Sequence, residues 1–423
     1  MQTVKFFTLG CKVNQYDTQL LREQLLAFAD FREIENNHPS DIYIINTCTV
    51  TASADKESFE LIRRAKKENP LGLIIVTGCL AELDSEKIKD IDNKIIILKN
   101  KEKKDLLKKL PITNYQLPFT EQSSVSYFKG HTRAFLKIQE GCDNFCSYCK
   151  VPLVRGSSRS KNPNEVIEEF KTLIKNGYKE IVLCGICLGS FGKDLKPNIE
   201  LIDLLERLDD LEGDFRIRLS SIEAWDITEK FIQNIEKIKK LCPHLHIPLQ
   251  SGDNLILKLM NRPVTPELYL EKIERLREKL PLLVITTDVL VGFPYEKEEN
   301  FLNTINLIKK IKPLKVHIFS FSPRPYTKAY SLGGKISLEQ LKRRVNLLKE
   351  VVKEQSFRVK QDFLGESVRV LFESSYNKGD DLYWQGFADN YLKVKLNCKE
   401  DLKNRFLKVR LESIEDDYIL GRF

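Results

Sequence analysis

The sequence lacks the features of membrane proteins and of secreted proteins. No apolar run approaches the roughly 18 residues that a transmembrane helix needs. The start, MQTVKFFTLGCK, has no basic flank, no long apolar core and no small-residue cleavage site, so it does not resemble a signal peptide. The chain also has no internal repeat and no low-complexity segment. We therefore expect a cytoplasmic protein that makes no contact with a membrane.

The composition is that of an ordered protein, with 42% hydrophobic and 30% charged residues. A chain of 423 residues is long enough for about three domains. Its ten cysteines favour metal or redox chemistry over disulfides, because cytosolic thiols stay reduced. Most of the net charge of +8 falls between residues 131 and 363. This balance is compatible with a polyanionic partner, although a lysine-rich solvated surface would explain it as well.

The first 110 residues alternate short apolar runs with helical patterns. The apolar runs cover 3–9, 41–47, 73–78 and 94–98, and amphipathic patterns cover 16–28 and 56–67. This βαβ rhythm predicts a parallel α/β domain over 1–112. The polar segment 113–130, which has no hydrophobic period, is predicted to be a linker.

A second series of alternating patterns begins near residue 131. Its six apolar runs, separated by helical patterns, cover 134–139, 180–186, 215–221, 244–250, 282–293 and 315–321. They predict a partial (β/α)6 barrel over 131–360, with its active face where the strands end. A long helix is predicted over 338–359. From 361 to 423, short alternating strands predict a small all-β domain, either a barrel or a sandwich.

The most specific local pattern is GCDNFCSYC at 141–149, which sets three cysteines at CxxxCxxC spacing. Three thiolates so close together indicate a metal site. A zinc site would need a fourth ligand, for which His131, Cys184 and Cys187 are candidates. A 4Fe–4S cluster held by three cysteines would instead leave one iron open to a substrate or cofactor.

Three more cysteines come soon after apolar runs: Cys11 in TLGC, Cys48 in INTC and Cys79 in VTGC. Because the carboxyl ends of neighbouring parallel strands face one crevice, we expect these three thiols to converge. A single cysteine of this kind is readily explained as a small buried residue, but three favour a second cluster site. Asn14 and Asp17 lie about one helical turn after Cys11, either near this site or as caps of the helix.

The CxxxCxxC triplet, with Tyr148 before its last cysteine, resembles that of the radical S-adenosylmethionine (SAM) enzymes. Five separated strings extend this to a resemblance to the methylthiotransferases over nearly the whole chain: TRAFLKIQEGCDNFCSYC (132–149), RIRLSSIE (216–223), HLHIPLQSGDN (244–254), ITTDVLVGFP (285–294) and FSPRPYT (321–327). That family joins an auxiliary-cluster domain, a radical SAM core and a TRAM domain regarded as RNA-binding. The resemblance implies these roles for 1–112, 131–360 and 361–423.

Within the family, TLGCKVNQYDTQ (8–19) and INTCTVTASADKES (45–58) resemble one branch in particular. That branch adds a methylthio group to C2 of N6-threonylcarbamoyladenosine at tRNA position 37. The alternatives are methylthiolation of N6-isopentenyladenosine in tRNA or of a ribosomal-protein side chain. The alternative that is not an enzyme is an RNA-binding protein whose fold is held by zinc.

The resemblance also implies roles for individual residues. Each triplet would hold a 4Fe–4S cluster, with the radical-generating cluster on Cys142, Cys146 and Cys149, and an auxiliary cluster, whose open iron carries the sulfur, on Cys11, Cys48 and Cys79. SAM would serve as both methyl donor and radical source. The residues expected to contact SAM are Tyr148, Gly185, Ser221, Glu223, Gln250 and Asp288. For the polar members of this set, a supporting hydrogen-bonding role is the alternative.

The tail carries YWQGFADNYLKVKLN (383–397), which is similar to the glycine turn and DNY pattern of TRAM domains. Trp384, Phe387 and Tyr391 are expected to stack on unpaired bases of a tRNA anticodon loop, although aromatics in a small β domain more often form its core. The side chains expected on phosphates are Lys393, Lys395, Lys408 and Arg410. We expect a monomer, and the sequence identifies neither the sulfur donor nor the electron donor.

The chain departs from the family strings in a few places. LCGICLGSFG (183–192) places Cys184 and Cys187 at the predicted second barrel strand, where packing is favoured over an extra ligand or redox role. Ala224 stands where proline is usual, and Tyr295 and Tyr326 stand where glycine is usual. These changes leave all six proposed cluster ligands in place.

Overall fold

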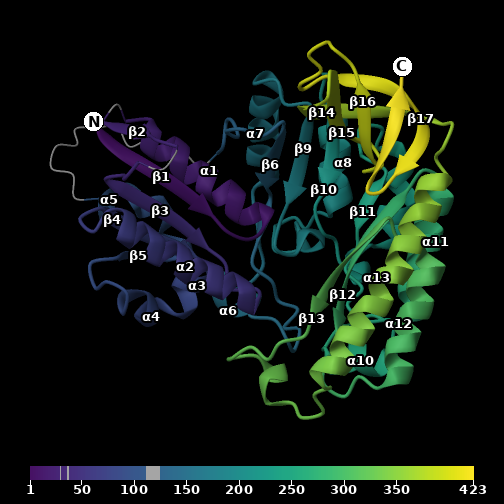
Figure 1. Ribbon diagram of the computed structural model, residues 1–423, viewed down its shortest axis with the longest axis horizontal. Coiled ribbons are helices and arrows are strands. Elements are labelled where there is room, and N and C mark those ends of the chain that lie inside the picture. Colours follow the sequence, from purple (N-terminus) through teal and green to yellow (C-terminus); the bar gives the residue numbers. More distant parts are fainter. Residues whose placement is uncertain (29, 36–37, 111–123) are drawn as a thin grey trace.

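The computed structural model describes residues 1–423 apart from 29, 36–37 and 111–123. Figure 1 shows an N-terminal α/β unit beside a larger barrel-like unit, with a small β-barrel packed on one end of the latter. The predicted linker at 113–130 lies mostly outside the described residues, and the domain boundaries stay predictions. No helix in the described part of the chain is long and apolar enough to cross a membrane.

The N-terminal unit is built on a five-stranded parallel sheet with the order β2-β1-β3-β4-β5. Its strands are β1 (Gln2–Thr8), β2 (Phe31–Glu33), β3 (Ile42–Thr47), β4 (Leu73–Gly78) and β5 (Ile96–Leu98). Its helices are α1 (Lys12–Leu26), α2 (Ala52–Glu68), α3 (Cys79–Leu83), α4 (Ser85–Lys89) and α5 (Leu106–Lys109). The predicted parallel α/β architecture is confirmed, and the one strand missed is β2, which is too short to show a period.

Alternation along the strands divides the apolar side chains between two faces of this sheet. Ile42 and Ile44 of β3 pack with α1 and α5, whereas Tyr43 and Ile45 pack with α2, α3 and α4. A parallel sheet covered by helices on both faces needs strands that are apolar throughout. This explains why β3 appears in the sequence as an unbroken apolar run.

The second unit contains the six predicted strands in sequence order. They are β6 (Arg133–Lys137), β9 (Glu180–Cys184), β10 (Arg216–Leu219), β11 (His244–His246), β12 (Val284–Val291) and β13 (Lys315–Ser320). They form two parallel three-stranded sheets, β6-β9-β10 and β11-β12-β13. Two isolated bridges connect these sheets, one between Ile217 and Leu241 and one between Ser221 and His246. A short antiparallel pair, β7 (Gln139–Glu140) and β8 (Arg159–Ser160), flanks the cysteine loop.

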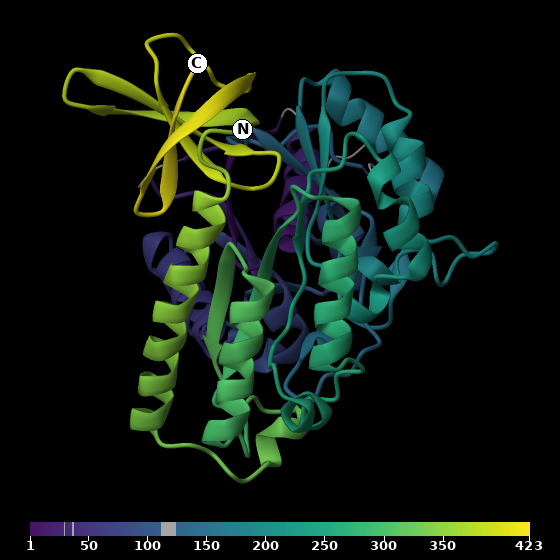
Figure 2. The same cartoon turned by 90° about the vertical axis from the view of Figure 1, so that its right-hand side faces the viewer.

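Helices cover the outside of this curved sheet (Figure 2). They are α7 (Pro163–Lys175), α8 (Leu201–Asp209), α9 (Glu229–Asn234), α10 (Asn254–Leu259), α11 (Pro266–Lys279), α12 (Glu298–Ile311) and α13 (Leu338–Gln361). The short helix α6 (Val151–Arg155) instead packs beside α3 of the N-terminal unit. The predicted long helix corresponds to α13, which leads into the C-terminal β-barrel.

The tail forms a closed barrel with the strand order β14-β15-β16-β18-β17. Its strands are β14 (Ser367–Lys378), β15 (Asp381–Ala388), β16 (Lys393–Asn397), β17 (Phe406–Glu415) and β18 (Tyr418–Arg422). Arg216 and Arg218 of β10 attach this small barrel to the second unit. Both guanidiniums pair with the buried carboxylate of Glu180 in the second unit, and both also reach across the junction. Arg216 contacts Asp389 at 2.5 Å, and Arg218 donates to the carbonyl of Asp389 at 3.1 Å.

The expected base-stacking role of the tail aromatics does not fit their surroundings. Trp384 is only 6% exposed and belongs to the core of the small barrel. Tyr391 stacks on His244 with ring centroids 4.3 Å apart, and Phe387 stacks on Tyr391 at 5.0 Å. These rings therefore build the barrel and its junction with the second unit, and the prediction that they stack on RNA bases is wrong for Trp384.

Candidate functional site

The first cysteine triplet lies at the carboxyl edge of the N-terminal sheet. Cys48 and Cys79 directly follow the neighbouring strands β3 and β4, and Cys11 is the N-cap of α1, just after β1. Cys48 and Cys79 are each 5% exposed, whereas Cys11 is exposed. Burial raises the pKa of Cys48 to about 11, and the nearby thiols of Cys79 and Cys11 add to this effect. The three cysteines therefore lie at one edge of the sheet, within electrostatic range of one another, and their role as ligands stays a prediction.

Two glycines allow the strand ends to approach one another closely. A Cβ on Gly10, which has φ +97°, would lie 2.9 Å from Sγ of Cys48. A Cβ on Gly78, which has φ +92°, would lie 2.3 Å from the carbonyl oxygen of Thr47. The glycine before the cysteine in TLGC and in VTGC is therefore a steric requirement of the site.

Arg155, the last residue of α6, links the two units at this edge. It is 3% exposed, and its Nε donates to Sγ of Cys79 at 3.3 Å. Its Nη1 donates to Asp17 at 3.0 Å and to Glu140 at 2.8 Å, and its Nη2 donates to the side-chain oxygen of Asn14. One guanidinium thus positions a cysteine of the first triplet from the helix that follows the second.

Asn14 and Asp17 both lie in this network and neither caps α1, whose N-cap is Cys11. The Asn14 amide, fully buried, donates to the carbonyl oxygens of Leu9 at 2.6 Å and Thr47 at 3.1 Å, which ties two strand-end loops together. Burial would raise the pKa of Asp17, but Lys103, Lys137 and Arg155 hold it well below its usual range. Asp17 is therefore a fixed negative charge.

The second triplet occupies the loop between β7 and α6. Gly141 has φ +77°, and a Cβ there would lie 2.0 Å from the carbonyl oxygen of Ser157. The backbone N–H of Cys149 donates to the carbonyl of Cys146 at 3.0 Å, so the chain folds back between these two ligand candidates. Burial raises the pKa of Cys149 to about 12, and the charges of Cys146 and Cys142 add to it. Cys142, Cys146 and Cys149 therefore lie within electrostatic range of one another.

Five of the six residues predicted to contact SAM lie in the cysteine loop or at strand ends. Tyr148 is in the loop, Gly185 follows β9, and Gln250 follows β11, while Ser221 and Glu223 follow β10. The sixth, Asp288, lies inside β12.

Three members of this group make separate contacts with neighbouring elements. A Cβ on Gly185 would lie 2.8 Å from Oε1 of Gln139. Gln250 has φ +68°, and its N–H donates to the carbonyl of Asp288 at 2.8 Å. Glu223 pairs with the buried Arg262 at 2.6 Å. Burial raises the pKa of Glu223, and the charge of Arg262 opposes this shift.

A group of polar side chains, half-buried or exposed, lies on β11, β12 and β13. Nε2 of His246 is 3.2 Å from the carboxylate of Asp288, and the ring of His317 is 5.7 Å from that of His246. Burial lowers the pKa of His317, and the nearby charges of Lys315 and Lys12 lower it further. The charge of Lys12, which follows Cys11, reaches His317, and the charge of Asp288 helps to raise the pKa of Glu223.

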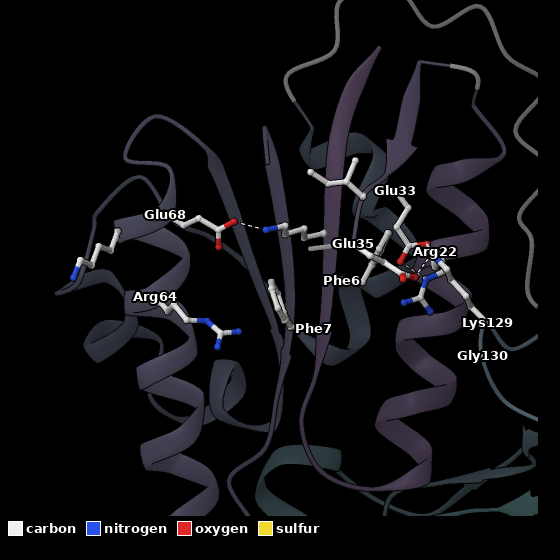
Figure 3. Close-up of a pocket in the computed structure, with 12 residues that line it drawn as sticks. Phe6, Phe7, Arg22, Glu33, Glu35, Arg64, Glu68, Lys129 and Gly130 are labelled. Carbon is white, nitrogen blue, oxygen red and sulfur yellow. Dashed lines mark hydrogen bonds and ion pairs between the residues drawn. The ribbon is translucent and has the colours of Figure 1, made fainter. Parts of the chain in front are cut away.

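A separate hollow of about 780 Å³ lies over β1 between α1 and α2 (Figure 3). Its charged side chains pair with one another, since Lys5 contacts Glu68 and Arg22 contacts Glu33 at 3.1 Å. None of the six cysteines of the triplets lines it. The reactive groups are therefore at the strand ends and not in this hollow.

Comparison with known proteins agrees with this geometry. The profile of the Radical SAM superfamily matches residues 136–308, and that of the uncharacterized protein family UPF0004 matches residues 3–98. Threonylcarbamoyladenosine tRNA methylthiotransferase MtaB of Bacillus subtilis is 38% identical over 100% of this chain and 96% of its own length. The chain belongs to the radical SAM methylthiotransferases.

Other relatives place this methylthiotransferase among tRNA enzymes of two kinds. MtaB of Thermotoga maritima is 35% identical over 100% of this chain and 97% of its own. The tRNA-2-methylthio-N(6)-dimethylallyladenosine synthase of Caldicellulosiruptor saccharolyticus is 32% identical over 99% of this chain and 92% of its own.

Solved structures share the fold of the methylthiotransferase at low identity. The cobalamin-dependent radical SAM enzyme OxsB, with aqua-cobalamin bound, has a TM-score of 0.53 at 14% identity and covers 84% of this chain and 56% of its own. The radical SAM methyltransferase TsrM of Kitasatospora setae, with cobalamin and a [4Fe-4S] cluster bound, has a TM-score of 0.53 at 10% identity and covers 78% and 76%.

Sequence reasoning missed two arginines of the methylthiotransferase that contact the sites, Arg155 and Arg262. Arg155 and Arg262 are single arginines whose role appears only when distant segments meet, although Arg155 follows the second triplet closely in VPLVRG. Cys187 forms a hydrogen bond with Cys142, which lowers the pKa of Cys142, and it accepts from Ser190 at 3.1 Å. Cys184 is buried in the core, as packing would require.

Proposed function

We propose that this methylthiotransferase acts on tRNA and adds a methylthio group to C2 of N6-threonylcarbamoyladenosine at position 37. The observation that carries the proposal is the pair of cysteine triplets at strand ends of the two units, which Arg155 joins. The chain also matches, over its full length, enzymes that are named for this substrate. Radical SAM methylthiotransferases use SAM and two 4Fe–4S clusters. We assign the second triplet to the radical cluster and the first to the auxiliary cluster.

The residues present fit these groups. Among the described residues, His246, Asp288 and His317 are the one set of three His, Cys, Asp or Glu ligand atoms within 4.8 Å of one another. In neither cysteine triplet do all three sulfur atoms lie within 4.8 Å of one another, as the ligands of a single zinc ion would. The thiolates that hold a four-iron cluster lie farther apart. This spacing supports clusters over a zinc site.

Buried polar atoms near the second triplet support SAM binding there. Oγ of Ser220 and Nε of Arg262 are buried without a hydrogen-bond partner in the described part of the chain. A zwitterionic ligand with amino, carboxylate and hydroxyl groups would satisfy such atoms. We assign Tyr148, Gly185, Ser221, Glu223 and Gln250 to this pocket, where Arg262 holds the Glu223 carboxylate in place.

Bound together, SAM and the two clusters supply hydrogen abstraction, a methyl group and the sulfur to be inserted. The chain contributes the geometry. Arg155 fixes Cys79 relative to the loop of the second triplet, and Asn14 fixes the loops after β1 and β3. Burial of these groups keeps water away from the space in which a reactive carbon would lie.

The polar group of His246, Asp288 and His317 supports the threonylcarbamoyl substrate over the dimethylallyl one. The threonylcarbamoyl substituent carries a carboxylate, a hydroxyl group and urea N–H groups, whereas the dimethylallyl substituent is a hydrocarbon. Lys12, His317 and Asp288 offer a cation, an imidazole and an acceptor. A hydrocarbon would form none of the hydrogen bonds or charge contacts that the threonylcarbamoyl group can form with these side chains.

The test is a reaction of anaerobically reconstituted enzyme with SAM and two tRNAs, one bearing threonylcarbamoyladenosine and one bearing isopentenyladenosine. Mass spectrometry of the digested nucleosides should show the 2-methylthio product only from the first. Product from the second tRNA alone would assign the enzyme to the other kind of relative. We further propose that it acts in the cytoplasm as a monomer, which sedimentation of the reconstituted protein tests.

A further inference from the structure

Tyr326 stands in a tight turn at the third position, where glycine is the usual residue. The N–H of Thr327 donates to the carbonyl of Arg324 at 3.3 Å, with Pro325 second in the turn. Tyr326 has φ +69°, as the third residue of a type II turn requires. A tyrosine in this left-handed region is strained relative to glycine, so its side chain calls for an explanation.

A second tyrosine provides a comparison within the same chain. Tyr295 follows Pro294, has φ +66°, and sits in a turn closed by the N–H of Glu296 and the carbonyl of Phe293 at 3.0 Å. Its ring covers Gly334, where an added Cβ would lie 2.5 Å from Cδ1 of Tyr295. The strain at Tyr295 is therefore offset by packing within the protein.

Tyr326 has no comparable packing. Its side chain is exposed, with 66% of the residue accessible, more than for Tyr295 at 49%. Among the described residues, the ring contact found for it is with Lys150, whose Nζ is 5.9 Å from the ring centroid. The strain is therefore not explained by the folded chain alone.

The loop that carries Tyr326 is anchored to both cysteine triplets. Arg324 donates to the carbonyl of Thr49, next to Cys48, at 2.9 Å. On the other side, the N–H of Ala329 donates to the carbonyl of Ser147, next to Cys146, at 2.7 Å. Figure 1 shows this loop after β13 reaching toward the N-terminal unit. Tyr326 thus projects from the bridge between the two sites.

We propose that Tyr326 is a stacking site for an unpaired base of the substrate RNA, next to the base that is modified. This rests on the proposed function, because it needs an RNA loop at the two triplets. Bases of single-stranded loops stack on exposed aromatic rings, and cations beside the ring attract the backbone. Lys150, although only 5% exposed, places such a cation 5.9 Å from the ring centroid of Tyr326.

The experiment compares Tyr326→Gly with Tyr295→Gly in the full-length reconstituted enzyme. Glycine suits both turns, so the Tyr326 variant should unfold at the same temperature as wild type or higher. Its dissociation constant for an anticodon stem-loop bearing threonylcarbamoyladenosine should rise roughly tenfold, within the range measured for base stacking. Iron content and SAM cleavage without RNA should not change. Tyr326→Phe should restore binding, because the ring and not the hydroxyl group stacks.

A stem-loop that is abasic beside the modified nucleotide separates stacking from other effects. Wild type and Tyr326→Gly should bind it equally, because the stacking base is gone. Equal binding of the intact stem-loop by wild type and Tyr326→Gly would overturn the proposal, as would an equal loss in Tyr295→Gly. If wild type binds and stacks the RNA but yields no methylthio product, the proposed function fails while the stacking site stands.

Discussion

Replacing Gly78 by alanine should remove the auxiliary cluster and leave the radical SAM site intact. Gly78 has φ +92° and ψ −165°, a region almost restricted to glycine that costs a residue with a side chain about 1–3 kcal/mol. An added Cβ would also lie 2.3 Å from the carbonyl oxygen of Thr47, whereas real Cβ contacts essentially never fall below 3.0 Å. The backbone must therefore shift by about 0.7 Å or more, which separates Cys79 from Cys48.

Gly177→Ala is a control for a positive-φ glycine that has open space around it. Gly177 has φ +87°, but a Cβ there would meet nothing within 4 Å. This variant should lose about 1–2 kcal/mol of stability and no iron. A loss of iron in Gly78→Ala alone would then show that a positive φ by itself does not cause the loss.

The assay is iron content after anaerobic reconstitution, followed by SAM cleavage and thiolation. Wild type and Gly177→Ala should bind about eight irons per chain, and Gly78→Ala about four. The Gly78 variant should still cleave SAM, since the second triplet lies in another unit, but should not thiolate tRNA. Eight irons and full thiolation in Gly78→Ala would refute the reasoning that this glycine sets the first triplet.

Three further predictions follow from the same contacts. Cys142→Ala should abolish SAM cleavage, whereas Cys11→Ala should keep cleavage and lose thiolation; equal loss of cleavage in both would overturn the assigned roles. Cys187→Ala should keep about eight irons, because that thiol only supports Cys142, and a fall to about four would make it a ligand. Glu180→Gln should destabilise the enzyme by about 3–5 kcal/mol in urea unfolding, because two buried guanidiniums lose their counter-ion, while Glu271→Gln on the surface should have little effect. Burial by itself would raise the pKa of Glu180, but Arg216 and Arg218 hold this pKa well below the ordinary 4.5. The stability from this carboxylate is thus present above pH 4.5 and lost as the pH falls below it, and the variant should lack this acid dependence.

The parts of the fold that were predictable are those that local pattern determines. Parallel strands covered on both faces appear as apolar runs, so four strands of the first sheet and all six of the second unit were found. The convergence of Cys11, Cys48 and Cys79 followed from their places at the ends of strands. β2 was missed because three residues are too few to show a period.

The parts that were not predictable depend on contacts between distant segments. Arg155 meets Cys79 only because the two units pack together, and no local pattern encodes that contact. Trp384 could have served either a core or an RNA surface, since both use aromatic residues, and the closed barrel places it in the core. Tyr326 differed from the expected glycine in the sequence, but its strain and exposure became apparent only with the turn.

The nucleoside content of tRNA tests the central claim most directly. A strain that lacks this gene should contain N6-threonylcarbamoyladenosine without its 2-methylthio derivative, and wild-type enzyme should restore the derivative. Enzymes carrying Cys11→Ala or Cys142→Ala should fail to restore it. An unchanged level of 2-methylthio-N6-threonylcarbamoyladenosine in the strain without the gene would contradict the account.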